Sequence, residues 1–560
     1  MTSSLPVESR SARPWWRDAV TYQIYIRSFT DANGDGKGDV EGIRSRLPYL
    51  KSLGIDAIWI TPWYPSPQND HGYDVADYMD IEPDYGTLDD AKRLIKEAHD
   101  LGIRVIVDIV PNHSSDQHKW FQEALASEPG SAARDRYIFR DGKGENGELP
   151  PNNWNAVFGG PAWHRIIEKD GKPGQWYLHL FAIEQPDFNW ENAEVRAYFE
   201  GVLKFWLDIG VDGFRIDVAH GMIKAEGLPD MPEKGSPEML AAVTMPFWDQ
   251  DGVHEIYRSW RKILDSYSGD RMAVAEAWVS PASRIARYLR HDELANSFNF
   301  DFLTAPWDVK VLRERIDGSL AAIKEVGAPA SWVFNNHDVV RSVDRFALGL
   351  TPGTGETTLD RQGDPAKLDL NLGIKRARAG ALLMLALPGG AYIYQGEELA
   401  LPEVRDIPEN RLTDPRWRMS NFTDRGRDGC RVPLPWKSEA DGAFGFSSRA
   451  DLAPHDAWLP QSNWWGSFSV EAQEKSAEST LHLYRKALSI RAAEEGLGDG
   501  PMTWLEMGDS VLAFARPGNF VCIVNFGEEI LLPMGEVLLS SGPLDQERLP
   551  RDTAVWIRTR

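Results

Sequence analysis

The stretch TLDDAKRLIKEAHDLGIRVIVDIVPNH, residues 87–113, contains the alternation of elements that decides the fold. In its first half, apolar residues recur at helical spacing after Thr87, a suitable N-cap, and Gly102 is placed to end the helix. The run IRVIVDIV follows at once and is almost entirely apolar, as expected for a strand covered on both faces. The stretch therefore predicts a helix followed by a buried parallel strand.

The same order occurs at two other places. Leu53-Gly54 precedes IDAIWITP (residues 55–62), and Ile209-Gly210 precedes VDGFRID (residues 211–217). Helices that alternate with buried strands predict a parallel sheet, and 560 residues suffice for one large barrel with insertions or for three ordinary domains. We predict an α/β fold, a TIM (β/α)8 barrel.

Two regions depart from this pattern. Gly, Pro and Asn are frequent between about Pro111 and Pro186, which is too long a stretch for an ordinary loop and predicts a small domain inserted after the third strand. Short alternating runs from about Leu497 predict a C-terminal antiparallel β domain. The predicted boundaries are 1–110 and 186–496 for the catalytic barrel, 111–185 for the inserted domain and 497–560 for a C-terminal β-sandwich.

Composition restricts the partners and the compartment. The chain has 84 acidic and 61 basic residues, a net charge of -23 that would repel nucleic acids and anionic membranes, so a neutral small molecule is the expected partner. No apolar stretch is long enough to span a bilayer. Cys430 and Cys522 alone cannot form a disulfide framework, and the first 14 residues lack the apolar centre of a secretory signal, which together predict a cytoplasmic protein.

Three acidic residues each lie at the end of a short apolar run. Asp217 lies in GFRIDVAH (213–220), Glu276 in AVAEAW (273–278) and Asp338 in FNNHDVVR (334–341). Burying a carboxylate at a strand end costs free energy unless the strand opens into a cleft, so this pattern favours a site of acid/base and nucleophilic chemistry. Each acid could instead be part of a structural salt bridge.

These motifs carry a family resemblance. DIVPNH (108–113), GFRIDVAH, AVAEAW and NNHD (335–338) resemble the four strand-end motifs of the α-amylase family, family 13 of the glycoside hydrolases. QPDFNW (185–190) and IDAIWITP resemble two accessory motifs of that family. The chain is most similar to the exo-acting α-glucosidase and oligo-1,6-glucosidase branch, including actinobacterial α-glucosidases.

The resemblance implies a retaining mechanism and assigns roles to the acids. Asp217 would be the nucleophile, Glu276 the general acid/base, and Asp338 would stabilise the oxocarbenium-like transition state. Arg215, two residues from Asp217 on the same strand face, would keep that carboxylate ionised. His113 and His337 would donate hydrogen bonds to the same sugar ring.

One end of the sugar pocket is expected to be closed. HGYDVADY (71–78) and GRDGCRVPLPW (426–436) resemble segments of exo-acting members in which an Asp and an Arg, here Asp74 and Arg427, clamp the terminal sugar. Tyr73 could stack beneath that sugar. An ordinary surface ion pair is the alternative, because other arginines crowd the same loop. The closed pocket predicts release of single α-glucose units from the non-reducing end of maltose and short α-glucooligosaccharides.

The residues after Asp217 leave specificity open. Ala219-His220 stands where endo-acting amylases have a Lys-His pair, which weighs against cleavage within polymers. Val218 is more typical of α-1,6 specificity, so the α-1,4 linkage is only favoured, and the role of His220 is not predicted. The alternatives are an oligo-1,6-glucosidase, a trehalose synthase, a sucrose-active transglucosylase or a non-catalytic binding relative. The chain could be a monomer or a homodimer.

The loop DANGDGKGD, residues 31–39, predicts a structural Ca²⁺ or Mg²⁺. Oxygen ligands alternate along it, and Gly36 would allow the sharp turn. A polar turn without a cation is the alternative, because Gly42 stands where an EF-hand has its bidentate Glu. No motif indicates zinc or a nucleotide, so no organic cofactor is expected. The predicted ligands are Asp31, Asn33, Asp35, the Lys37 carbonyl and Asp39.

Overall fold

A sheet of eight strands forms the centre of the protein in a computed structural model, which describes residues 13–231, 245–350 and 364–559. The neighbouring strands pair in parallel in the order β10-β11-β1-β2-β3-β7-β8-β9, and within the described residues no ladder joins β9 to β10. The sheet is therefore a nearly closed barrel, which confirms the predicted fold class. The strands are β1 (Val20–Ile24), β2 (Ala57–Ile60), β3 (Arg104–Ile109), β7 (Gly213–Ile216), β8 (Met272–Ala275), β9 (Asn296–Ser297), β10 (Ser331–Val333) and β11 (Gly390–Tyr394).

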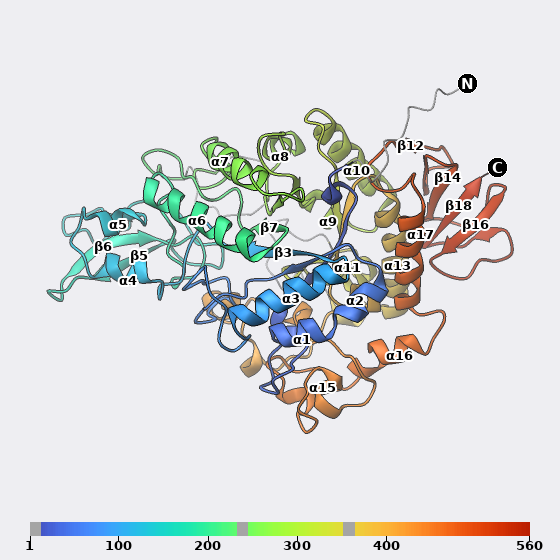
Figure 1. Ribbon diagram of the computed structural model, residues 1–560, viewed down its shortest axis with the longest axis horizontal. Coiled ribbons are helices and arrows are strands. Elements are labelled where there is room, and N and C mark those ends of the chain that lie inside the picture. Colours follow the sequence, from blue (N-terminus) through green and yellow to red (C-terminus); the bar gives the residue numbers. More distant parts are fainter. Residues whose placement is uncertain (1–12, 232–244, 351–363, 560) are drawn as a thin grey trace.

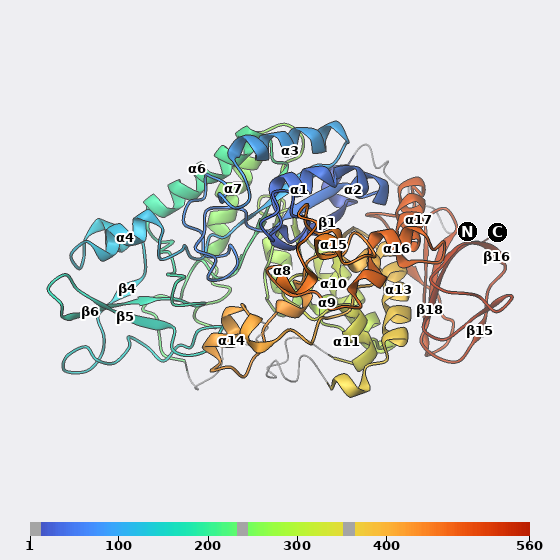
Figure 2. The same ribbon diagram turned by 90° about the horizontal axis from the view of Figure 1, so that it is seen from below.

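A helix follows each of these strands before the next one begins, and the last helix follows β11. Figure 1 and Figure 2 show these helices around the barrel strands. They are α2 (Leu47–Leu53), α3 (Leu88–Asp100), α6 (Ala193–Ile209), α7 (Val253–Asp265), α8 (Ala282–Tyr288), α10 (Val309–Lys324), α13 (Leu370–Ala386) and α17 (Thr480–Ala493). Shorter helices lie between them: α1 (Val40–Ser45), α9 (Phe300–Leu303) and α11 (Ser342–Leu348).

Helix α3 begins and ends as its sequence predicts. The Thr87 side chain accepts a hydrogen bond from the Asp90 backbone N–H, and the Asp90 side chain accepts one from the Thr87 N–H, which completes a capping box. Gly102 has φ +73°, a left-handed conformation that glycine adopts without a Cβ clash. The helix buries Ala91, Leu94, Ile95 and Ala98 against the barrel.

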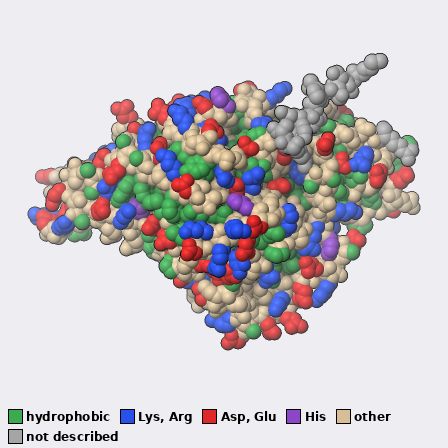
Figure 3. All heavy atoms as spheres, viewed as in Figure 1, with side chains coloured by type: hydrophobic (Ala, Val, Ile, Leu, Met, Phe, Trp, Pro, Cys, Tyr) green, Lys and Arg blue, Asp and Glu red, His purple; other side chains and the backbone are tan. Residues whose placement is uncertain are grey.

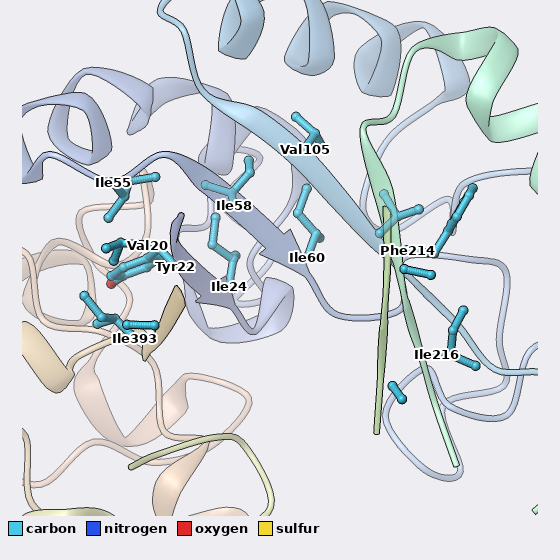
Figure 4. Packing of buried hydrophobic residues seen from close by; sticks show 14 of the residues in the cluster. Val20, Tyr22, Ile24, Ile55, Ile58, Ile60, Val105, Phe214, Ile216 and Ile393 are labelled. Atoms are coloured by element: carbon cyan, nitrogen blue, oxygen red, sulfur yellow. The ribbon is translucent and has the colours of Figure 1, made fainter. Parts of the chain in front are cut away.

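The core explains why the strands read as continuous apolar runs. Along β2, Ile58 and Ile60 belong to the large cluster between the sheet and its helices, while Ala57 and Trp59 belong to a second cluster inside the barrel. Successive side chains of a strand point to opposite faces, and both faces are buried here. Figure 4 shows the first cluster around the labelled side chains of β1, β2, β3 and β7.

The segment between β3 and α6 contains a small subdomain of its own. Its three strands form an antiparallel sheet in the order β4-β6-β5. It lies at one end of the molecule, and the C-terminal strands lie at the opposite end (Figure 1). The elements are α4 (Lys119–Leu125), α5 (Ala132–Asp135), β4 (Phe139–Arg140), β5 (Trp163–Ile167) and β6 (Pro173–Leu178).

The chain after β11 first forms a long segment with short helices and then a β domain. A five-stranded antiparallel sheet, β12-β13-β14-β18-β16, confirms the antiparallel strands predicted from Leu497, and a two-stranded ladder joins β15 to β17. The helices are α14 (Pro415–Met419), α15 (Asp441–Gly445) and α16 (Val470–Glu474). The strands are β12 (Thr503–Trp504), β13 (Val511–Arg516), β14 (Phe520–Asn525), β15 (Ile530–Leu531), β16 (Gly535–Ser540), β17 (Arg548–Leu549) and β18 (Thr553–Thr559).

The face of the molecule drawn in Figure 3 carries charges of both signs. Figure 3 shows acidic and basic side chains interspersed over the face drawn, so the net charge of -23 is not confined to one patch there. In the part of the chain that the structure describes, no helix is both long and apolar enough to cross a membrane.

Candidate active site

The predicted site residues converge at the carboxyl ends of the barrel strands. Asp217 directly follows β7, Glu276 directly follows β8, and Asp338 lies five residues after β10. In a parallel barrel all these ends lie at one face, where loops from different strands meet. The alternation of strand and helix thus brings together three acids that lie far apart in the sequence.

The Arg215 guanidinium joins the predicted nucleophile to the predicted acid/base. One of its nitrogens, Nη1, lies 2.7 Å from Asp217 Oδ1, and the other, Nη2, lies 2.7 Å from Glu276 Oε2. Nη1 also lies 2.8 Å from Asp108 Oδ1, on the neighbouring strand β3. The sequence contained a signal for Asp108 that the prediction did not use, because it is the only acid in the apolar run of its strand.

Burial and the positive charge of Arg215 have opposite effects on the pKa of Asp217. Burial raises the pKa of Asp217 well above its usual range, Arg215 lowers it, and the adjacent Glu276 carboxyl raises it again. Burial likewise raises the pKa of Asp108 to about 7 despite the same guanidinium. The predicted ion pair between Arg215 and Asp217 is formed, but burial opposes the lowering of the Asp217 pKa by Arg215. Burial and the neighbouring Glu276 carboxyl therefore favour the protonated form of Asp217, whereas Arg215 favours its ionised form.

Glu276 receives donors on both of its carboxyl oxygens. The Val218 backbone N–H donates to Oε2 over 3.0 Å, and the Trp278 indole N–H donates to Oε1 over 2.9 Å. Val218 has φ +43°, a left-handed conformation that is unusual for a β-branched residue and orients this N–H. Sequence reasoning missed Trp278, although it lies two residues after Glu276 in AVAEAW.

Asp338 is held by two arginines from the segment after β11. Arg427 Nη1 and Arg431 Nη2 each lie 2.9 Å from its Oδ1. Although burial favours the protonated form, the two arginines lower the pKa of Asp338, so it is ionised. These contacts bring the long segment after β11 against the barrel.

The two predicted histidines are buried and neutral. His113 Nε2 lies 3.2 Å from the Tyr73 carbonyl oxygen, and burial lowers the pKa of His113 to about 3. His337 Nδ1 lies 2.7 Å from Gln23 Nε2, and burial lowers the pKa of His337 well below its usual range. The Tyr73 ring stacks on His337 with centroids 5.3 Å apart. Both imidazoles can therefore donate only one hydrogen bond each.

The predicted ion pair between Asp74 and Arg427 is not formed. Arg427 Nη2 instead lies 2.9 Å from Asp70 Oδ1. Asp74 is buried and accepts hydrogen bonds from the backbone N–H groups of Asn69 and Asp70 and from the Ser66 hydroxyl. The reason is the turn at residues 70–74: it directs Asp70 toward the arginine and turns Asp74 back onto the preceding backbone.

A third acid, besides Asp338 and Asp70, contacts Arg427. Asp414, just before α14, accepts from the Arg427 side chain at Nε over 2.6 Å and from its backbone N–H over 2.8 Å. Its side chain is fully buried, and the arginines lower its pKa despite that burial. Sequence reasoning missed Asp70 and Asp414 because the sequence does not reveal which acids of two distant loops face one arginine.

The residues after Asp217 connect the barrel to the inserted region. Lys224 is buried, with its Nζ 2.8 Å from Asp187 Oδ2 and 2.9 Å from Asn112 Oδ1. His220 is also buried and packs on the Trp248 ring at 4.7 Å. Burial lowers the pKa of His220 to about 4.

The predicted cation loop is well ordered by internal hydrogen bonds. Asp31 accepts from the backbone N–H groups of Gly34 and Gly36, and Asp39 accepts from those of Ala32, Asn33 and Gly42. Gly36 has φ +94°, as the predicted sharp turn requires. The oxygen donors suit a hard cation. However, among the described residues no group of three or more His, Cys, Asp or Glu side chains is arranged to hold a metal ion.

Known proteins share both the sequence and the fold. The chain is 38% identical over 544 residues to a probable α-glucosidase of Rhizobium meliloti (strain 1021), which covers 92% of this chain and 90% of that protein. It is 33% identical over 578 residues to an oligo-1,6-glucosidase of Parageobacillus thermoglucosidasius, with 95% and 96% covered.

Solved structures agree over almost the full length. The α-glucosyl transfer enzyme XgtA has 33% identity and a TM-score of 0.82, with 98% of this chain and 100% of that chain covered. The trehalulose synthase MutB from Pseudomonas mesoacidophila MX-45 has 29% identity and a TM-score of 0.84 over the same shares. The family model described as alpha amylase, catalytic domain, matches residues 23–500. This chain is therefore a glycoside hydrolase of the α-amylase family.

Proposed function

We propose that this chain is a retaining, exo-acting α-glucosidase that releases α-glucose from the non-reducing end of maltose and short α-glucooligosaccharides. The observation that supports it most is the bridge by which Arg215 joins Asp217 and Glu276, each at the end of a neighbouring strand. A retaining glycosidase needs two carboxyls about 5 Å apart, one ionised and one protonated. The shared Arg215 guanidinium, which holds the two carboxyls close together, suits that requirement.

In the first half of the proposed reaction, an Asp217 carboxylate oxygen attacks the anomeric carbon. The glycosidic C–O bond breaks, its electron pair stays on the leaving oxygen, and that oxygen takes the proton from Glu276. A glucosyl ester of Asp217 results. Asp338 is ionised beside two arginines and is suited to bind sugar hydroxyls and to stabilise positive charge at the anomeric centre.

In the second half, Glu276 acts as the base. It takes a proton from a water molecule, whose oxygen attacks the anomeric carbon while the ester bond to Asp217 breaks and its electron pair returns to the carboxylate. Glu276 is then protonated again, Asp217 is ionised again, and glucose leaves with the α configuration. Two inversions at one carbon give retention.

The exo-acting mode is supported by the ion pair of Asp70 and Arg427. Two charged side chains that meet at 2.9 Å, close to Asp338, are suited to bind the hydroxyls of a terminal sugar and to leave no space for a further one. We therefore propose that Asp70, and not Asp74 as the sequence suggested, binds the terminal sugar together with Arg427. Tyr73, beside His337, would lie under the same sugar ring.

Glucosyl transfer is the second candidate. It is supported by the similarity of nearly the whole chain to an α-glucosyl transfer enzyme and to a trehalulose synthase. Transfer differs from hydrolysis only in the acceptor of the second half, where a sugar hydroxyl takes the place of water. The linkage is proposed as α-1,4, and the oligo-1,6-glucosidase relative keeps α-1,6 as the alternative.

Product analysis tests the proposal. The enzyme is incubated with maltose, isomaltose, maltotriose, sucrose, trehalose and soluble starch; products are separated by chromatography, and the first-formed anomer is followed by NMR. We expect α-glucose from maltose and maltotriose and little reaction with starch. Initial β-glucose would refute retention, internal cleavage of starch would refute the exo mode, and trehalulose from sucrose would favour the transferase.

Two smaller proposals complete this assignment. A cytoplasmic location is supported by Cys430 and Cys522, both buried and unpaired, which is typical of proteins in a reducing compartment. A structural Ca²⁺ or Mg²⁺ in the loop 31–39 is supported by its alternating oxygen donors and by the left-handed Gly36.

A further inference from the structure

The Glu276 carboxyl group is held asymmetrically. Its Oε2 accepts from Arg215 over 2.7 Å and from the Val218 backbone N–H over 3.0 Å. Its Oε1 accepts from the Trp278 indole N–H over 2.9 Å. A carboxyl oxygen has two lone-pair positions, so two donors fill Oε2, whereas one donor on Oε1 leaves a position free. Oε1 is therefore the oxygen that can carry a transferable proton.

Trp278 is itself fixed in orientation. Its ring stacks on Phe300, the first residue of α9, with centroids 3.7 Å apart and planes 14° apart. Only 8% of Trp278 and 3% of Phe300 is exposed. An indole that is buried and stacked on one ring can direct its single N–H along only one line, and that line ends at Glu276 Oε1.

We propose that Trp278 is a positioning residue for proton donation, because its indole N–H fixes the plane of the Glu276 carboxyl and so directs the Oε1 proton toward the glycosidic oxygen. This inference rests on the proposed function of Glu276. The last torsion of a Glu side chain has a broad energy minimum, so donors on Oε2 alone leave that plane free to tilt. Misplacement of a proton donor by a fraction of an ångström is costly to catalysis.

The test uses Trp278→Phe, which keeps an aromatic ring for Phe300 and removes the N–H. For maltose, whose leaving group needs a proton, kcat/KM should fall by about 10- to 100-fold, part of the full contribution of a general acid. For α-glucosyl fluoride, whose leaving group needs no proton, kcat/KM should change by less than about 3-fold. A purely structural defect would lower both values equally, and that outcome, or an unchanged rate with maltose, would overturn the proposal.

Trp556→Phe is the matched control, because it removes an indole N–H bond of 3.0 Å to the Leu382 carbonyl in the C-terminal sheet. It should leave the ratio of the two kcat/KM values as in the wild type. If Trp278→Phe does not fold, Phe300→Leu gives a second test: it keeps the N–H but removes the ring that orients it. In Phe300→Leu we expect kcat/KM to fall by about 3- to 10-fold for maltose, with the same dependence on the substrate as in Trp278→Phe. If this substrate dependence is absent, the proposal is overturned.

Glu276→Gln separates this inference from the proposed function. If Glu276→Gln itself lowers kcat/KM equally for maltose and for the fluoride, the acid assignment is wrong. If it affects maltose far more than the fluoride while Trp278→Phe does not, the acid assignment stands and only the role of Trp278 is wrong.

Discussion

The Arg427 guanidinium lies 2.9 Å from the Asp70 carboxylate, and the Asp74 carboxylate, four residues later, contacts backbone N–H groups instead. Two acids of one turn therefore contact different groups: Asp70 contacts an arginine side chain, and Asp74 contacts the backbone. Asp70 contacts Arg427, and in the proposed clamp its charge acts on the substrate. Asp74 stabilises the turn that presents Asp70.

Matched substitutions distinguish these two acids. Asp70→Asn removes a charge from the proposed clamp, and we expect kcat/KM for maltose to fall by about 10- to 100-fold, mostly through a higher KM, as for the loss of a charged hydrogen bond. Asp74→Asn places an amide group against backbone N–H donors, so we expect a lower melting temperature with KM within about 3-fold of the wild type. Steady-state kinetics and calorimetry of both variants measure this. The reverse pattern would return the clamp to Asp74.

The proposed catalytic roles of Asp217 and Glu276 are tested by isosteric amides. Asp217→Asn and Glu276→Gln should each lower kcat by several orders of magnitude and keep the native circular dichroism spectrum, because each removes chemistry and little volume. Glu276→Gln should still form a glucosyl ester on Asp217 from α-glucosyl fluoride, detectable by mass spectrometry. Asp100→Asn, on the exposed end of α3, is the control. A variant that keeps a tenth of the wild-type kcat would refute its assignment.

Stability should fall in mild acid because of buried neutral histidines. Burial lowers the pKa of His179 to about 4, against about 6.5 in an unfolded chain. Between these values the unfolded state binds the extra proton, so this residue's contribution to stability is complete above pH 6.5 and is lost as pH falls toward 4. In His179→Asn the slope of the free energy of unfolding against pH should be smaller than in the wild type by up to about 1.4 kcal/mol per pH unit in that window.

Melting temperatures of the wild type and of His179→Asn, measured from pH 5 to pH 8, check this expectation. The difference in melting temperature between the two proteins should be largest at pH 7 to 8 and should shrink toward pH 5. The exposed His291→Asn is the control and should show no such trend. A constant difference at every pH would contradict the expectation.

The proposed cation site is tested by removing and restoring the ion. After dialysis against a chelator, 1 mM Ca²⁺ should raise the melting temperature by roughly 2–5 °C without changing the preferred substrate, because a cation that binds only the native state stabilises it by mass action. The double variant Asp31→Asn, Asp35→Asn should lose this response. If neither Ca²⁺ nor Mg²⁺ changes the melting temperature of the wild type, the loop is a polar turn held by its own hydrogen bonds.

The sequence determined the fold because that information is local and repeated. Thr87 and Gly102 set the limits of α3, and the apolar run from Ile103 predicted a strand buried on both faces. Acids at the ends of such strands must meet, since parallel strands end at one face of the barrel. The positions of Asp217 and Glu276 at one site therefore followed from sequence order alone.

Only the tertiary structure decided which side chains contact one another. Whether Asp70 or Asp74 meets Arg427 depends on the path of a turn relative to a segment more than 350 residues away, which no local pattern encodes. The Trp278 indole contacts Glu276 because Phe300, from another element, fixes its ring. Helix and strand periodicity specify faces to within a residue or two, whereas hydrogen bonds require distances near 3 Å, and these are set only when distant segments pack together.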